Sequence, residues 1–457
     1  MFEGRKTNHL VKWAEAYFIL FILLQPILDM TAYINLPISE PIRVLTMGLG
    51  FIYILLLPNT RAKKFALGYI GVLALFMIAS FANNFVFKDP FSLSVEMIYI
   101  IKTVYVLMML IIYYFVFQSL SKRTNWRNSV QKYVFISMSI IGVVMVVSSI
   151  TGTGKRSYDA LAKEGHSGWF FAANELSAIL AMGFSVMLLY FMRQSNIKTK
   201  LLYIPLLLSA IWGILTVGTK VGLGGLLMVL GFGSLIAFVD IWKKKQWSNA
   251  IIVPLLLAGT IAIIPFSAIG NNLGYTVTKM QEGNGADGTD PATGEDGSID
   301  GPDRTEQAKE LLSGRNDFLR DKINQFEEAN ISQKTLGMGR GGNYEDVPKL
   351  VEMDFIDWFF NYGVLGIIIL ALPIAFFGIT IIKHLIETRF KVFDGETLLI
   401  GIAVGLGLGT AFLAGHVLSS PASGIYLVLF LAYLHHATKP TVKNVQSGSN
   451  DINSEVG

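Results

Sequence analysis

The sequence of 457 residues contains no cysteine, only six histidines and few charged residues. The absence of cysteine excludes disulfide bonds, thiol nucleophiles and cysteine-ligated metal ions. The histidines form no cluster with the spacing of a zinc site. The sequence also lacks a Walker loop, a G-x-S-x-G nucleophile motif and an EF-hand. We therefore expect neither a metal ion nor a cofactor.

Charged residues make up 15% of the chain, whereas hydrophobic residues make up 52% and the mean hydropathy is +0.51. A soluble domain cannot bury so large an apolar fraction, so an ordinary globular enzyme is excluded. The net charge of +4 does not indicate a nucleic-acid partner, because membrane proteins carry excess Lys and Arg for reasons of topology. The expected surroundings are a lipid bilayer.

The apolar residues are gathered in blocks that match the roughly 20 residues a helix needs to cross a bilayer. Their length and lack of charge predict an all-α, polytopic membrane protein with about twelve transmembrane helices. These lie near 13–30, 42–57, 64–82, 96–118, 133–151, 173–192, 201–217, 220–241, 249–270, 361–383, 396–415 and 421–437.

Basic residues alternate between the connections of these spans. One set of connections, together with both tails, carries about 20 cations, and the opposite set carries about six, so the positive-inside rule places both termini in the cytoplasm. The predicted organisation is transmembrane helices 1–9 in 1–270, a large extracellular loop in 271–360 and transmembrane helices 10–12 in 361–437. We expect 438–457 to be a disordered cytoplasmic tail.

The extracellular loop divides into two parts. Residues 271–303 are rich in Gly and Asp and nearly free of apolar side chains, which predicts a flexible acidic flap. From 304 to 360 apolar residues recur at three- and four-residue steps, which predicts amphipathic helices.

Three cations lie at or near this loop on the predicted outer side. Lys220 is in "VGTKVGLGG", Arg315 in "LLSGRNDFLRDK" and Arg340 in "LGMGRGGN". Guanidinium groups bind phosphate oxygens bidentately, lysine adds a point charge, and glycine-rich backbone lets N–H groups approach an anion. Together the three residues are candidates for binding a diphosphate. The alternative is that Lys220 snorkels and both arginines pair with nearby acids.

Acidic residues precede the tenth span in "LVEMDFIDWFFNYGVLG". Asp354 and Asp357 share one helix face, and Glu352 points elsewhere. A carboxylate partly desolvated by the neighbouring aromatic rings is a candidate general base, and Glu352 and Asp354 are the catalytic candidates. The alternative is that these acids stabilise a helix N-terminus.

The connection between the fifth and sixth spans is basic although it lies outside. Arg156 and His166 belong to it, and Glu175 follows in the first turn of the sixth span. These three residues are candidates for substrate contact, because the cations oppose the topological bias and indicate an anionic partner. Lys102 is expected to pair with an acid, and His416 is expected to be an ordinary helix-end residue.

Short motifs in this order resemble the O-antigen ligase and O-antigen polymerase superfamily, in particular the polymerases of anionic Gram-positive wall polysaccharides of the teichuronic acid type. "GTK" matches a Thr-Arg pair with Lys220 in place of arginine, and "SGR" ends in Arg315. Gly337 and Gly339 match a G-x-G stretch, and "ANE" also belongs to the resemblance. The family's His-Asn motif precedes a G-x-x-G motif, matched here by Gly363 and Gly366, and Glu352 takes the position of the histidine.

The resemblance implies a glycosyltransferase of type C in a bacterial plasma membrane, with its active site on the outer face. It implies polymerisation of undecaprenyl-diphosphate-linked oligosaccharide repeats into a cell-surface polysaccharide, with inversion and without a metal ion. The undecaprenyl-diphosphate-linked glycan is the expected partner, together with other membrane proteins of polysaccharide assembly. Two alternatives stay open: a ligase that transfers the finished glycan to another acceptor, and a transporter or flippase for lipid-linked oligosaccharides.

Overall fold

A computed structural model of the chain describes residues 9–123, 125–158, 163–274, 315–344 and 349–440, with the side chains of 243, 244 and 315–317 excepted. Within these ranges the secondary structure is helical apart from one isolated β-bridge between Arg156 and His166. The predicted fold class, an all-helical membrane protein, is confirmed. The acidic segment 271–303 lies almost entirely outside the described residues, as does the tail 441–457.

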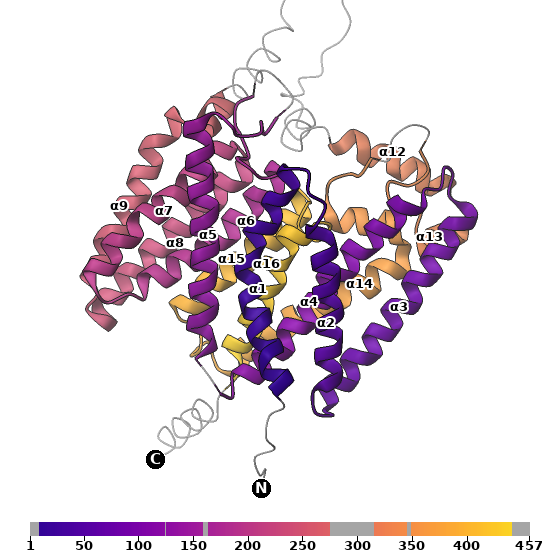
Figure 1. The fold of residues 1–457 in the computed structure, drawn as a ribbon, viewed down its shortest axis with the longest axis horizontal. Helices are drawn as coiled ribbons and strands as arrows, with labels where there is room; N and C mark the ends of the chain where they lie inside the picture. The colour runs from indigo at the N-terminus through magenta and orange to yellow at the C-terminus, as the bar shows by residue number, and fades with distance from the viewer. Residues whose placement is uncertain (1–8, 124, 159–162, 275–314, 345–348, 441–457) are drawn as a thin grey trace, which may run out of the picture.

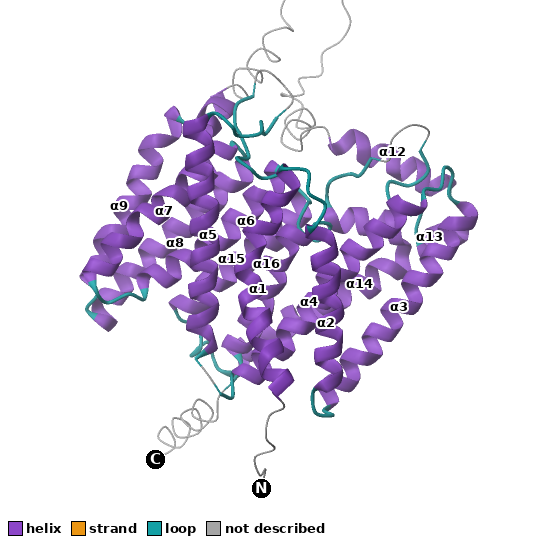
Figure 2. Ribbon diagram, viewed as in Figure 1, coloured by secondary structure: helices purple, strands orange, loops and turns teal. Residues whose placement is uncertain are grey.

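The helices follow one another in a simple up-and-down order (Figures 1 and 2). In chain order they are α1 (His9–Tyr33), α2 (Ser39–Leu56), α3 (Arg61–Phe87), α4 (Leu93–Leu120), α5 (Trp126–Thr151), α6 (Ala173–Met192), α7 (Ile197–Val217), α8 (Lys220–Lys244), α9 (Trp247–Ile263), the 3-10 turn η1 (Ile264–Phe266), α12 (Arg315–Glu328), α13 (Ile331–Leu336), α14 (Asp354–Glu387), α15 (Gly395–Leu413) and α16 (Pro421–Thr438).

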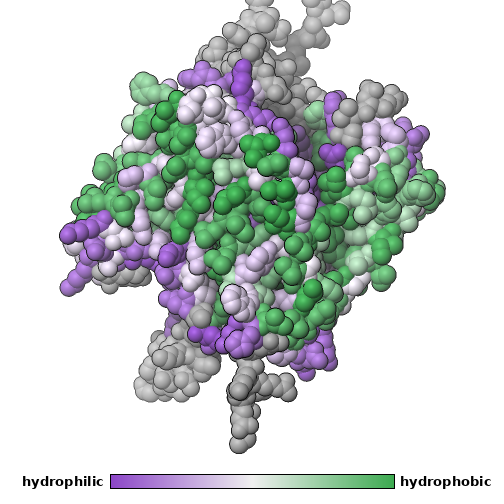
Figure 3. Space-filling view, viewed as in Figure 1, coloured by the Kyte–Doolittle hydropathy of each residue, from purple (hydrophilic) through white to green (hydrophobic). Residues whose placement is uncertain are grey.

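Eleven of the described helices are long and apolar enough to cross a bilayer. The twelfth predicted span forms α16, which is buried at every one of its 18 residues and packs against α4, α6, α14 and α15. The surface accordingly shows a broad hydrophobic band between more hydrophilic ends (Figure 3). A helix enclosed by other helices needs no lipid-facing apolar stripe, so α16 can contain histidines and serines.

The two ends of the bundle differ. Helix α1 begins and α16 ends at one end, which we call the terminal end, whereas α12 and α13 lie at the other, which we call the loop end (Figure 1). At the terminal end, buried Glu396 pairs with Arg193 and with Arg127, and Glu15 pairs with Arg123. Charges at membrane depth are costly unless they are paired. These contacts join α1 to the α4–α5 connection, and α15 to α5 and to the end of α6.

At the loop end, α12 and α13 are attached to the bundle by a glycine-rich turn. A second hydrophobic cluster, formed by residues of α12, the turn and the start of α14, contains Met338 and Phe326. Gly337 has a φ of 96°, and a Cβ there would lie 2.1 Å from the carbonyl oxygen of Asn361. The turn can therefore lie directly on the backbone of α14 only because this position has no side chain.

Helix α14 begins at Asp354, seven residues before the predicted span. Its backbone leaves the helical conformation at Gly363, with a φ of 69°. A Cβ at Gly363 would lie 2.5 Å from the backbone of Thr335, and one at Gly366 would meet Tyr362 and Phe76. The G-x-x-G motif thus marks a bend at which α13 contacts α14, with a short helical segment before the span.

Candidate active site

Two carboxylates in the first turn of α14 each hold one neighbouring loop. Asp357 accepts hydrogen bonds from the backbone N–H groups of Val351 (2.8 Å) and Met353 (3.2 Å). Asp354, which is 1% exposed, accepts from three consecutive N–H groups of the loop before α16 and from one hydroxyl. These donors are His416, Val417, Leu418 and Ser419, at 2.7 to 3.1 Å. Because Asp354 and Asp357 lie on one face of α14, they place the loop before α14 and the loop before α16 side by side.

The two loops bring Glu352 and His416 together. The distance from His416 Nε2 to Glu352 Oε2 is 3.7 Å. Both residues have left-handed backbones, with φ of 64° at Glu352 and 60° at His416. Such conformations cost non-glycine residues free energy and persist where the surrounding structure holds them, often at functional sites. Here Gly415 permits the approach, because a Cβ there would lie 2.6 Å from the carbonyl oxygen of Glu352.

The surroundings of His416 shift its acid–base equilibrium. Burial on its own would lower the pKa of His416, but the adjacent Glu352 carboxylate, followed by Asp354 and Glu175, outweighs it and raises the pKa above the ordinary value. The side chains of His416 and Glu352 are still 30% and 44% exposed. The pair is thus reachable from outside and consists of an imidazole whose protonated form a carboxylate stabilises.

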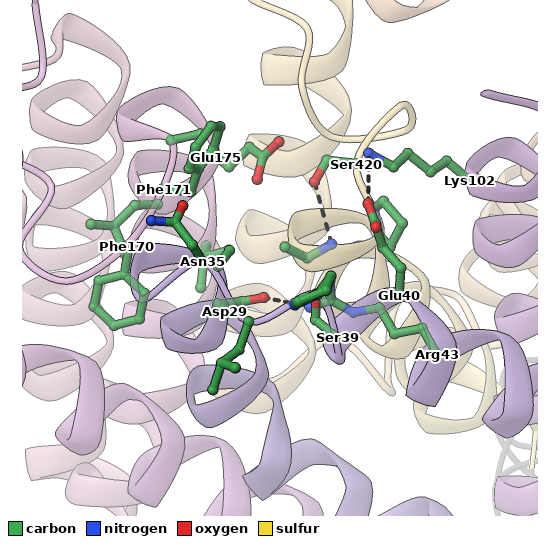
Figure 4. Close-up of a pocket in the computed structure, with 18 residues that line it drawn as sticks. Asp29, Asn35, Ser39, Glu40, Arg43, Lys102, Phe170, Phe171, Glu175 and Ser420 are labelled. Carbon is green, nitrogen blue, oxygen red and sulfur yellow. Dashed lines mark hydrogen bonds and ion pairs between the residues drawn. The ribbon is translucent and has the colours of Figure 1, made fainter. Parts of the chain in front are cut away.

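A cavity of about 460 Å³ with several charged lining residues lies near this pair, and we call it the outer cavity (Figure 4). Glu175 and Ser420 line it, Glu175 interacts electrostatically with His416, and Ser420 follows His416 closely in the chain. Its walls come from the end of α1, the α1–α2 connection, the start of α2, α4, the segment before α6, the start of α6 and the start of α16. Among its polar lining residues are Asp29, Asn35, Glu40, Arg43 and Lys102. The site is therefore built from segments that are far apart in the sequence.

Two ion pairs occupy this cavity. Arg43 pairs with Asp29, and both side chains are nearly buried. Arg43 Nε and Asp29 Oδ2 make no hydrogen bond within the described part of the chain. Lys102 pairs with Glu40 at 3.3 Å, and the side chains of this pair are 34% and 54% exposed. The expected pairing of Lys102 is confirmed, but its partner is a half-exposed acid at the edge of a cavity.

Of the predicted anion-binding residues, Lys220 is the exposed first residue of α8. The preceding Thr219 accepts a hydrogen bond from the N–H of Gly222 (3.2 Å) and bonds to the hydroxyl of Ser177 on α6. Helix α8 packs against α6, α7, α9 and α15. The "GTK" motif is therefore a capped helix start at the loop end, with its lysine at the surface.

Arg340 lies elsewhere at the loop end, above α3 and α4. Its N–H donates to the carboxylate of Glu96, and its carbonyl accepts from Lys88 (2.7 Å), which itself pairs with Glu96. The turn that contains Arg340 follows α13, which packs against α3 and α14. Arg315 begins α12, and its side chain is not among those described. Lys220 and Arg340 thus lie over different parts of the bundle.

Arg156 and His166 face each other across the isolated bridge in the α5–α6 connection. Arg156 is exposed. His166 bonds through Nε2 to the hydroxyl of Ser149 (2.8 Å), and burial lowers its pKa. These contacts fold the connection whose end, at Phe170 and Phe171, lines the outer cavity.

The residues of the site that were not predicted include Arg43, His416 and, as a cavity residue, Lys102. Ionisable side chains within predicted spans were the available signal for Arg43 and Lys102, since such groups face the bundle interior or a functional path. His416 carried no comparable signal, because its importance depends on the contact with Glu352. Among the described residues no group of three or more acidic or histidine side chains has the arrangement of a metal site.

Comparison with known proteins gives a family. A family model described as "O-antigen ligase like membrane protein" matches residues 12–439, almost the whole chain. A search of curated proteins gives no significant match.

Proposed function

The chain belongs to the O-antigen ligase-like membrane protein family, whose members assemble polysaccharides, and we propose that it is a polysaccharide polymerase. In this proposal it joins undecaprenyl-diphosphate-linked oligosaccharide repeats into a cell-surface polysaccharide of the Gram-positive, teichuronic acid type. The observation that carries the proposal is the contact of Glu352 with His416 beside the outer cavity. Such a pair can remove a proton from an acceptor hydroxyl.

The proposed reaction needs only a base and a place for the leaving group. The acceptor oxygen forms a bond to the anomeric carbon while the bond from that carbon to the diphosphate oxygen breaks. The electron pair leaves on the diphosphate, and the acceptor proton goes to the Glu352–His416 pair. Attack opposite the leaving group inverts the anomeric centre, and no cofactor takes part.

The roles within the site follow from the contacts. His416 takes the proton, and Glu352 stabilises the imidazolium that forms. Asp354 is a positioning residue, because its two oxygens are engaged by the backbone and the Ser419 hydroxyl of the loop that carries His416. Glu175 lines the cavity and raises the pKa of His416. Because Lys220 and Arg340 lie over different helices, we propose Lys220, Arg315 and Arg340 as contacts to the diphosphates of two lipid-linked substrates, the donor and the acceptor. Arg156 and His166 are proposed contacts to the glycan.

The positive-inside count supports placing the loop end, and hence the site, on the outer face of the plasma membrane with both termini in the cytoplasm. Lipid-linked repeats would then be joined where the finished polysaccharide is needed.

The test is reconstitution of the purified protein with a lipid-linked repeat unit, followed by electrophoresis of the glycan products. A polymerase gives a ladder of chain lengths, a ligase gives one shifted product with its acceptor, and a flippase gives no new product. A single product or none would refute polymerisation. An E352Q preparation serves as the inactive control.

A further inference from the structure

An apolar groove of about 530 Å³ adjoins the outer cavity. Between α2 and α4 it is lined by Pro41, Val44, Leu45, Ile98 and Ile101. It also shares Pro37, Glu40 and Lys102 with the outer cavity. The polar and apolar spaces are therefore continuous at the Lys102–Glu40 pair.

The groove opens toward the surroundings of the bundle. Leu45 is 63% exposed and Ile98 is 48% exposed. Both belong to helices that are long and apolar enough to cross a bilayer. Such surfaces lie in hydrocarbon, so the groove offers a hydrocarbon chain a path alongside the outer turns of α2 and α4.

The ion pair at the junction is weakly held. Lys102 and Glu40 are 3.3 Å apart and substantially exposed, and exposed pairs contribute little stability because solvent competes with them. An anionic group that enters the junction can therefore replace Glu40 as the partner of Lys102, as a phosphate binds lysine through a charge-assisted hydrogen bond.

The cavity beyond the junction fits a group rich in hydroxyls. Its carboxylates and the Asn35 amide offer acceptors and donors (Figure 4). Arg43 Nε and Asp29 Oδ2 make no hydrogen bond with described residues, although Arg43 is 6% exposed. Both residues line the cavity, so a sugar that fills it lies against the Arg43–Asp29 pair. The ring of Phe171, 61% exposed, adds an apolar face at the wall.

We propose that the groove and the outer cavity together bind one polyprenyl-diphosphate-linked sugar. Its hydrocarbon chain lies between α2 and α4, its diphosphate replaces Glu40 at Lys102, and its first sugar lies over the Arg43–Asp29 pair. Glu175 also lines the cavity and interacts electrostatically with His416. The groove, the junction and the cavity thus offer surfaces for the chain, the diphosphate and the sugar. The base that deprotonates the attacking hydroxyl of the acceptor is His416. This inference rests on the proposed function. It adds Lys102, which belongs to none of the sequence motifs, to the residues proposed to bind the diphosphate.

The experiment measures binding without turnover. The full-length protein, reconstituted in nanodiscs, carries the photoreactive residue benzoylphenylalanine in place of Leu45, and the probe is radiolabelled undecaprenyl diphosphate bearing one hexose. The control carries the photoreactive residue in place of Leu255 of α9, which is 68% exposed. We expect strong labelling at position 45 that unlabelled undecaprenyl diphosphate removes and phosphatidylglycerol does not. Equal labelling at both positions, or equal competition by phosphatidylglycerol, would mean bulk lipid in the groove and would overturn the proposal.

Three variants test the junction in the same binding assay. K102Q should weaken probe binding about tenfold, the effect of one lost charge-assisted contact. K383Q is the matched control, because Lys383 also pairs with a glutamate, Glu387, but near the C-terminal end of α14, away from the groove. E40Q should strengthen binding, because it removes the acid that competes for Lys102. A merely structural ion pair would make K102Q and E40Q weaken binding alike, and that result would overturn the proposal.

The two experiments distinguish failure of the groove site from failure of the polymerase assignment. A wild-type preparation that forms a ladder without labelling at position 45 would overturn the groove site and leave the polymerase in place. Labelling at position 45 in a preparation that forms no ladder would support the groove site and overturn the polymerase.

Discussion

At the residue scale, Glu352 and His416 depend on each other. Their contact exists because Asp354 and Asp357 each bind one of the two loops. A carboxylate next to an imidazole stabilises its protonated form, so the two side chains should act as one unit in proton transfer.

Loss of either member should therefore abolish most of the activity. E352Q and H416N should each lower the polymerisation rate by about 10² to 10⁴-fold, the range for loss of a general base. The double variant should be no slower than the worse single variant, because residues that act as a unit are not additive. Multiplicative losses in initial-rate measurements would show that the residues act independently.

The pH dependence carries a second prediction. The proposed base is neutral His416, so activity falls as the pH drops below its pKa. Glu352 helps to raise that pKa, with Asp354 and Glu175 adding to it, whereas burial opposes it. E352Q removes the carboxylate charge that raises the pKa of His416, whereas burial still lowers it. The pKa of His416 should therefore fall, and the acid limb of the residual activity should move to lower pH. E328Q, at an exposed acid of α12, should leave the limb in place. An unchanged limb in E352Q would contradict the assignment.

At the scale of elements, the glycine motifs hold α12 and α13 onto the bundle. Gly337 and Gly363 allow α13 and α14 to touch through their backbones. The N–H of Gly339 donates to the carbonyl of Asn361, and Asn83 donates to that of Gly337 (3.2 Å). Motif residues shared with the family therefore have a structural explanation here that is independent of substrate.

A single added methyl group tests this contact. G363A places a Cβ 2.5 Å from Thr335 and keeps a left-handed backbone, so it should lower the free energy of unfolding by about 1 to 3 kcal/mol, the cost of such strain. G378A is the matched control on the same helix, where a Cβ meets nothing within 4 Å. It should be neutral or stabilise by about 0.5 to 1 kcal/mol. Thermal denaturation in detergent measures both, and equal midpoints would contradict the packing argument.

At the scale of the whole molecule, the arrangement requires the cavity, α12 and α13 to share one side of the membrane. The chain has no cysteine, so a single introduced cysteine can be labelled without background. I331C, on α13 at a position 83% exposed, should react with a membrane-impermeant maleimide added to intact cells. K122C, at an exposed position after α4, should react only after permeabilisation. The reverse pattern would place the site in the cytoplasm and exclude the proposed reaction.

The sequence alone determined the all-helical membrane class, because span length and hydropathy are local properties that the bilayer imposes on every crossing segment. It also indicated Glu352 as a candidate base and the order of the motifs. Only the tertiary structure decided that Glu352 meets His416, that Asp354 holds the loop of His416, and that Arg43 and Lys102 line one cavity. Those contacts join residues far apart in the chain through packing and buried hydrogen bonds, which no local pattern of apolar and charged residues encodes.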